Sequence, residues 1–271
     1  MDQRLMSAML ELDDRHWWYR GRRRIIRAEL DRLSLPAAGR VLDAGCGSGR
    51  TLEELGGYGE VYGVELDPGA AAVARERGCG EVREGRLEEL PYEDGSFDLI
   101  TCLDVIEHTP DDRVTLRELR RVSKPGAFLL VTVPAYQGLW STHDVANHHY
   151  RRYSRGRLRA AAHESGWRVR RMTSFNGLLL GPAAAVRLAE RRRLRRPNGD
   201  YKPELTLGPE WLNAVLEQPL RLEARWLQDG RTIPAGLSLL AVLENPEAPP
   251  GAAEDPGDAL PQGAADHPPI A

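Results

Sequence analysis

Along most of the chain, short apolar runs alternate with segments in which apolar residues recur every three or four positions. The first pattern is typical of buried strands and the second of amphipathic helices, so their alternation predicts an α/β fold with a doubly wound, mostly parallel sheet. Seven strands are expected, at 41–43, 60–65, 81–85, 97–102, 127–133, 167–173 and 233–243. Helices are expected at 51–55, 69–77, 112–122 and 155–164, with Asp67, Asp111 and Ser154 as N-caps.

The segments outside this alternation suggest how the chain is organised. Residues 1–35 are expected to form an N-terminal helical lid, although their tryptophans could instead attach a helix to the domain. The core is expected to comprise residues 36–174 together with 233–244, with residues 175–232 as a helical insertion. Residues 245–271 contain mainly Pro, Ala, Gly, Asp and Glu, which predicts a disordered tail.

A glycine-rich turn follows the first predicted strand, in the stretch Asp43-Ala44-Gly45-Cys46-Gly47-Ser48-Gly49. Glycine at three alternate positions lets the backbone turn sharply and approach a ligand closely. The dinucleotide fingerprint Gly-x-Gly-x-x-Gly is different, because here the third glycine comes one residue early and Arg50 stands where Gly or Ala is needed. The Asp43 carboxylate at the strand end disfavours a pyrophosphate and favours a cationic ligand.

This turn resembles motif I of the class I S-adenosylmethionine-dependent methyltransferases, and later segments resemble the type 11 branch of that family. They are the acid Glu65 at the end of the second strand, the Asp104–His108 segment after the fourth strand, and Lys124-Pro125-Gly126 before the fifth. The resemblance implies S-adenosylmethionine as cofactor and a Rossmann-like methyltransferase fold closed by an antiparallel seventh strand. The cofactor-binding residues that it implies are Asp43, Gly45, Cys46, Gly47, Gly49, Glu65, Leu66, Leu87 and Asp104.

Within this resemblance, Glu65 would accept hydrogen bonds from the ribose hydroxyls, and Leu66 and Leu87 would lie against the adenine. Arg86 departs from the family, which usually has an acid at that position to accept from the adenine amine. The adenine contact is therefore expected from Leu87 and backbone groups, or from Glu88.

A histidine-rich segment after the fifth strand is expected over the same crevice, because ligands bind at the carboxyl ends of parallel strands. It resembles a bacterial methyltransferase subgroup that carries Trp-Ser-x-His-Asp and His-x-Arg-Arg-Tyr motifs. His143 and His149 are the first candidates for a general base and His108 is the third, because imidazole accepts protons near neutral pH. Two alternatives stay open for this segment, a buried polar network and a metal site. The metal site is the less favoured of them, and no metal is expected.

The remaining bulk properties limit the partners. The net charge of −3 gives no overall attraction to nucleic acid, and three separated cysteines fit reduced thiols in a cytoplasmic protein. No stretch has the composition of a signal peptide or a membrane span. The apolar and then basic stretch 178–196 is compatible with peripheral membrane contact, or with a helical pair that forms a homodimer or a substrate cap.

These observations predict a methyltransferase that acts on a small-molecule, glycan or lipid-linked acceptor. Two alternatives remain, a nicotinamide-dependent oxidoreductase and a non-catalytic methyltransferase-like partner protein. Because S-adenosylmethionine carries an electrophilic methyl group, the protein would act mainly by aligning the acceptor and excluding water.

Overall fold

A computed structural model describes residues 12–193 and 208–247, and its central element is a seven-stranded sheet in the order β3-β2-β1-β4-β5-β7-β6. The strands are β1 (Arg40–Ala44), β2 (Glu60–Glu65), β3 (Glu81–Glu84), β4 (Phe97–Leu103), β5 (Ser123–Pro134), β6 (Arg168–Phe175) and β7 (Ser238–Glu244). Strand β7 runs antiparallel to β5 and β6, and the other pairs are parallel. The predicted fold class, including the antiparallel seventh strand, is therefore confirmed.

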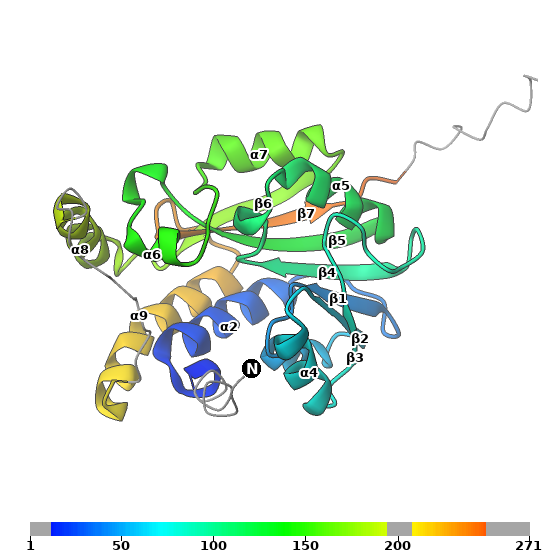
Figure 1. Cartoon of the computed structure of the whole chain (residues 1–271), viewed down its shortest axis with the longest axis horizontal. Helices are drawn as coiled ribbons and strands as arrows, with labels where there is room; N and C mark the ends of the chain where they lie inside the picture. The colour runs from blue at the N-terminus through cyan, green and yellow to red at the C-terminus, as the bar shows by residue number, and fades with distance from the viewer. Residues whose placement is uncertain (1–11, 194–207, 248–271) are drawn as a thin grey trace, which may run out of the picture.

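Helices cover both faces of the sheet (Figure 1). They are α2 (Trp17–Leu30), α3 (Arg50–Leu55), α4 (Pro68–Glu76), α5 (Asp112–Val122), α6 (Thr142–Ala146), α7 (Arg155–Glu164), α8 (Leu180–Arg193) and α9 (Glu210–Gln228), with short 3-10 helices η1 (Ile106–His108) and η2 (Gln137–Leu139). Figure 1 shows α5 and α7 on one side of the sheet and α2, α4 and α9 on the other. None of the helices within the described ranges is long and apolar enough to cross a membrane.

The predicted N-caps form as expected. The Asp67 carboxylate accepts from the backbone N–H of Ala70 at 2.7 Å, and the Ser154 hydroxyl accepts from that of Arg157 at 3.1 Å. Asp111 caps α5 in the same way. These bonds satisfy N–H groups that a helix start otherwise leaves without partners, which explains why the three helices begin where the sequence indicates.

The central strands are buried on both faces, which is why they read as continuous apolar runs. In β4, Ile100 and Cys102 belong to the core beneath α5 and α7, whereas Leu99 and Leu103 belong to the core on the opposite face. This burial holds the carboxyl ends of β1, β2 and β4 in a fixed relation, and those ends carry the candidate site.

Helix α9, which belongs to the predicted insertion, packs in the core on one face of the sheet. Leu220, Ala224 and Leu227 of α9 are buried in the same core cluster as Ile25 and Ile26 of α2. The domain boundaries as a whole stay predictions. The structure does not describe residues 1–11, the tail beyond 247 or the side chains of the basic run 187–196. The expectations for these parts of the chain therefore stay predictions.

Candidate functional site

The turn between β1 and α3 uses the left-handed backbone that its glycines permit. The φ angles of Gly45, Gly47 and Gly49 are +82°, +55° and +78°. A Cβ atom on Gly49 would lie 2.8 Å from the Cα and Cβ atoms of Ala74 in α4, so this glycine is needed for packing. A Cβ atom on Gly47 would meet no described atom within 4 Å, so the turn leaves open space there for a ligand.

The Glu65 carboxylate at the end of β2 is held by two backbone N–H groups. Its Oε2 atom accepts from Gly47 at 2.8 Å, and its Oε1 atom accepts from Asp67 at 2.9 Å. Because a carboxylate oxygen has two acceptor positions, each oxygen retains one for a ligand hydroxyl. The turn and the second strand therefore build one preorganised acceptor site.

The Asp43 carboxyl at the end of β1 is 2% exposed, and its Oδ1 atom accepts from the Thr101 hydroxyl at 2.7 Å. Burial raises the pKa of Asp43 to about 6, although the Thr101 hydrogen bond and nearby Arg22 act in the opposite direction. A cation beside Asp43 would favour its ionised form, so the site is suited to a positively charged ligand.

Two cavities meet at Gly45. The first, of about 240 Å³, lies between the turn and the N-terminal segment that includes α2, and the second, of about 420 Å³, lies beyond β2 and β4. Among the predicted cofactor residues, Asp43, Gly45, Cys46 and Gly47 line the first cavity, and Gly45, Glu65, Leu66, Leu87 and Asp104 line the second. Gly49 lines neither, which agrees with its packing role.

The N-terminal segment lies against the first cavity. Arg22 of α2 makes an ion pair with Asp104 at 2.8 Å, and Arg50 makes one with Asp14 at 2.7 Å. The Ser48 hydroxyl also donates to the Asp13 carboxylate. Tyr19 and Arg22 line the cavity, so this segment closes one side of it; a lid that moves remains a prediction.

His149, from the histidine-rich segment, belongs to a buried polar network. Its Nδ1 atom lies 2.9 Å from Asp144 Oδ1, and Arg152 Nε donates to the same oxygen at 2.7 Å. Ser141 caps α6 and forms a capping box with Asp144. Burial acts to raise the pKa of Asp144, but the hydrogen bonds from His149 and Arg152 hold it well below its usual value. Asp144 is therefore a fixed anion that orients the His149 ring.

The structure brings together two of the three predicted base candidates. The rings of His108 and His149 are nearly perpendicular with centroids 4.6 Å apart, whereas His143 lies farther, with its centroid 6.2 Å from that of His149. His148 is exposed. Burial and the neighbouring His149 lower the pKa of His108, which lines the second cavity. Their catalytic roles stay predictions.

Glu107 precedes His108 in the loop after β4. Its side chain is fully buried, and neither carboxylate oxygen has a hydrogen-bond partner within the described part of the chain. Burial and the charge of Asp104 raise the pKa of Glu107 well above its usual range. The backbone does hold the loop, because Tyr150 N–H donates to the Glu107 carbonyl at 2.8 Å.

The sequence indicated some site residues only as members of a segment. Tyr19 and Arg22 lie in the N-terminal segment expected as a lid, but their place beside the first cavity depends on how α2 packs across the sheet. Asp144 and Arg152 could be read only as members of a motif. The local pattern that Ser141 and Asp144 fit is a capping box, which predicts the start of a helix and does not predict a buried anion.

The described residues fit the predicted cofactor. S-adenosylmethionine presents a ribose diol, an ammonium, a carboxylate and a sulfonium. Glu65 offers acceptors for the diol, and the buried Asp43 carboxylate is suited to one of the positive charges. Arg22 Nε is buried without a hydrogen-bond partner in the described ranges, which leaves a donor for an anion beside the first cavity.

Comparison with known proteins shows a likeness to methyltransferases over part of the chain. The model of a family described as "Methyltransferase domain" matches residues 42–131. The chain is 38% identical over 108 residues to a ubiquinone biosynthesis O-methyltransferase of Xanthomonas oryzae pv. oryzae (strain PXO99A), covering 37% of this chain and 45% of the relative. A relative of the same description from Hahella chejuensis is 37% identical over 106 residues, covering 36% of this chain and 44% of that protein. The chain thus spans less than half the length of these curated relatives.

Solved structures show the same fold over more of the chain. The YcgJ protein of Bacillus subtilis has a TM-score of 0.55 at 20% identity, covering 84% of this chain and 99% of that one. A phosphoethanolamine N-methyltransferase 2 of Haemonchus contortus, in complex with S-adenosyl-L-methionine, has a TM-score of 0.54 at 18% identity, covering 82% of this chain and 52% of that one. At these identities the likeness concerns the fold.

Proposed function

We propose that this chain, whose residues 42–131 are a methyltransferase domain of the class I S-adenosylmethionine-dependent type, methylates a hydroxyl group of a small-molecule acceptor. The observation that carries the proposal is the Glu65 carboxylate, fixed by the Gly47 N–H and open to the second cavity. An oxygen acceptor is supported by the similar relatives, whose descriptions name O-methylation.

Cofactor binding is assigned to residues at the ends of three strands. Glu65 holds the ribose, Asp43 and Asp104 face the positive charges, and Leu66 and Leu87 pack against the adenine. Arg22 donates to the carboxylate from the N-terminal side. Because Glu65 is held by backbone hydrogen bonds and Asp43 by burial, these two groups need little ordering when the cofactor binds.

S-adenosylmethionine supplies a methyl group on a positively charged sulfur, which needs a correctly aligned nucleophile. In the net reaction the acceptor's O–H becomes O–CH₃, the cofactor leaves as S-adenosylhomocysteine, and a proton is released. The chain's task is to hold the acceptor oxygen in line and to keep water out. The groups on the acceptor side of the second cavity are His108 and, next to it, Glu107 and His149. We assign activation of the hydroxyl to this cluster.

Binding measurements give the first test. Calorimetric titration of the full chain with S-adenosylhomocysteine, NAD and NADP should show binding of S-adenosylhomocysteine alone. Binding of the nicotinamide cofactors alone would instead establish the oxidoreductase alternative and overturn the proposal.

Transfer of a labelled methyl group identifies the acceptor class. Phenols, aliphatic alcohols, amines, glycans and lipid-linked sugars should be offered separately, and the product's linkage determined by mass spectrometry. We expect O-methylation of small hydroxyl compounds. Exclusive labelling of nitrogen or carbon would contradict the oxygen acceptor, and cofactor binding without any transfer would support the non-catalytic alternative.

A further inference from the structure

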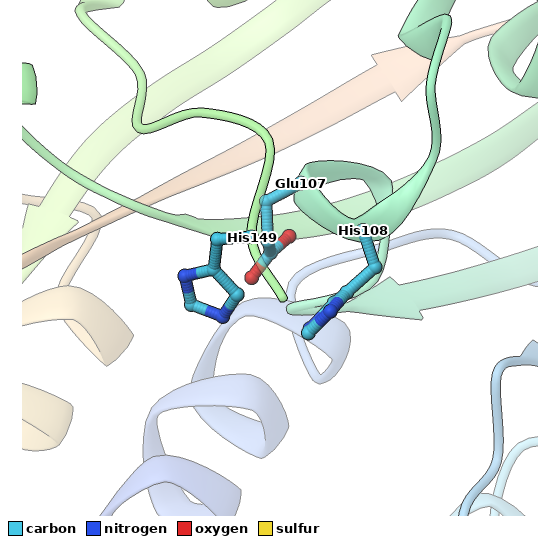
Figure 2. A group of neighbouring side chains, drawn as sticks. All are labelled: Glu107, His108 and His149. Carbon is cyan, nitrogen blue, oxygen red and sulfur yellow. The ribbon is translucent and has the colours of Figure 1, made fainter. Parts of the chain in front are cut away.

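Glu107, His108 and His149 come from two separate segments and meet beside the second cavity. One potential ligand atom from each lies within 4.8 Å of the other two. Figure 2 shows the Glu107 carboxylate between the two imidazole rings in this view, with Glu107 and His108 on η1 and His149 on the loop that passes beside it. Two imidazole nitrogens and one carboxylate oxygen therefore gather in one small region.

The Glu107 carboxylate is the strongest sign that something binds there. It is fully buried, and within the described part of the chain neither of its oxygens accepts a hydrogen bond. A buried carboxylate without a partner is costly, so buried charges are normally paired or coordinate metals. Its charged neighbours are of both signs, the anion Asp104 and the cations Arg22 and Arg152, but neither arginine donates a hydrogen bond to the Glu107 carboxylate.

The surroundings of His149 match those of a metal-binding histidine. Its Nδ1 atom is held by Asp144 at 2.9 Å, so the Nε2 atom is left as the ligand atom. Metal-binding histidines almost always donate their other ring N–H to a carboxylate or carbonyl, which fixes the tautomer and ring orientation. Asp144 is itself fixed by Arg152 at 2.7 Å and by the backbone N–H of Ser141 at 2.8 Å.

The ligand set selects a class of metal. Two imidazoles and one carboxylate are the set found in catalytic zinc sites that keep a fourth position open, and in non-haem iron sites. Mg²⁺ and Ca²⁺ prefer oxygen ligands throughout, so they suit this cluster poorly. Metal–ligand bonds of about 2.0–2.2 Å bring tetrahedral ligands to roughly 3.4 Å from one another. The present spacing would therefore have to close by up to about 1.4 Å, which a side-chain rotation of the partly exposed His108 can supply.

We propose that Glu107, His108 and His149 bind a divalent transition-metal ion, with Zn²⁺ as the representative ion, and that Asp144 positions His149. This assignment goes against the sequence-based expectation that no metal is bound. His108 lines the second cavity, so the open coordination position faces the space assigned to the acceptor. Provided that the proposed function holds, the metal would lower the pKa of the acceptor hydroxyl, and its proton would leave to solvent.

Metal binding should be measured on the full chain after removal of metals with a chelator. Calorimetric titration with ZnCl₂ should give one site per chain. Titration with CoCl₂ should give visible absorption bands of four- or five-coordinate cobalt, while MgCl₂ should give no binding. Zinc should also raise the melting temperature, because a ligand of the native state stabilises it.

Variants locate the site. Glu107→Gln keeps the shape of the side chain and removes the charged ligand, and His149→Gln removes a nitrogen ligand. Each should weaken zinc binding at least 100-fold and abolish the zinc-dependent rise in melting temperature. Asp144→Asn should weaken it about 10- to 100-fold through the orientation of His149. The matched controls are the exposed Glu76→Gln and His163→Gln, which should bind zinc as the wild type does.

Equal zinc binding by wild type and Glu107→Gln would show that zinc binds elsewhere and would overturn the proposal, as would the absence of zinc binding. Binding of S-adenosylhomocysteine to metal-free protein should be measured in parallel. It tests the methyltransferase proposal independently of the zinc site. If metal-free protein bound S-adenosylhomocysteine and transferred methyl groups as fast as zinc-loaded protein, the methyltransferase proposal would stand. His108 and His149 would then act as bases without a metal.

Discussion

Gly47 donates its backbone N–H to Glu65 Oε2 across 2.8 Å, so the glycine turn after β1 and the acid that ends β2 form one unit. A second N–H, from Asp67, holds the other oxygen at 2.9 Å. The two donors fix the carboxylate before any ligand arrives. Its remaining acceptor positions are therefore aimed by the backbone and do not depend on a flexible side chain.

Glu65→Gln should lower the affinity for S-adenosylhomocysteine about tenfold or more, because a hydrogen bond to a charged acceptor contributes about 1.5–3 kcal/mol. Isothermal titration calorimetry measures the change. Glu60→Gln, at the exposed start of the same strand, is the matched control and should bind normally. Equal affinities for wild type and the Glu65→Gln variant would show that the ribose lies elsewhere.

Alanine should act differently at two positions of the glycine turn, mainly on stability at Gly49 and mainly on cofactor binding at Gly47. Gly49→Ala places a Cβ atom 2.8 Å from the Ala74 backbone at a φ of +78°, so it should lower the free energy of unfolding by about 3 kcal/mol. Gly47→Ala meets no described atom within 4 Å, so it should cost about 1–2 kcal/mol from its left-handed backbone and mainly weaken cofactor binding. Urea unfolding and calorimetry on both variants separate the two effects, and a reversed order of stabilities would be inconsistent with this packing.

Asp43→Asn should change how stability depends on pH. The folded-state pKa of Asp43 is raised from 3.8 to about 6, so its contribution to stability is fully present below pH 3.8 and is lost as the pH rises through about 6. Relative to wild type, the ligand-free variant should therefore gain about 3 kcal/mol between pH 4 and 7. Urea unfolding across this range measures the difference, and a difference that does not vary with pH would mean that burial does not perturb Asp43.

The sequence predicted the elements of the fold because they depend on local patterns. Continuous apolar runs mark the strands, and Asp67 and Ser154 mark helix starts through bonds to residues three positions away. The glycine turn could be recognised for the same reason. The approach of Arg22 to Asp104, and of His149 to Glu107, joins segments far apart in the chain. No local pattern encodes such a contact, so these parts of the candidate site required the structure.

Asp144→Asn should destabilise the protein by about 3–5 kcal/mol, because it leaves the guanidinium of Arg152 buried without its counter-charge. The side chains of Asp144 and Arg152 are 0% and 1% exposed. Adding Arg152→Met should recover part of the loss in urea unfolding. The matched control is Asp94→Asn, whose partner is Arg121 and whose carboxylate is 81% exposed, with an expected cost of about 0–1 kcal/mol. Equal costs for the two aspartate variants would contradict a buried network.

The contact between Gly21 of α2 and Leu220 of α9 tests whether α9 belongs to the core. A Cβ atom on Gly21 would lie 2.3 Å from Leu220 Cδ1, so Gly21→Ala should cost about 1–3 kcal/mol, despite alanine's better helix propensity. Leu220 is fully buried, and Leu220→Ala alone should cost about 2–5 kcal/mol.

In the double variant, the methyl group added at position 21 occupies space that Leu220 has vacated. The free energy of unfolding lost in the double variant should therefore be smaller than the sum of the two single losses by about 1 kcal/mol or more. The control cycle pairs Gly21→Ala with Leu222→Ala on the same helix, where the leucine is 57% exposed and its loss should be additive. Additive costs in the Leu220 cycle would mean that α9 does not pack on α2 in solution. Coupling there, with additivity at Leu222, would place this part of the predicted insertion in the core.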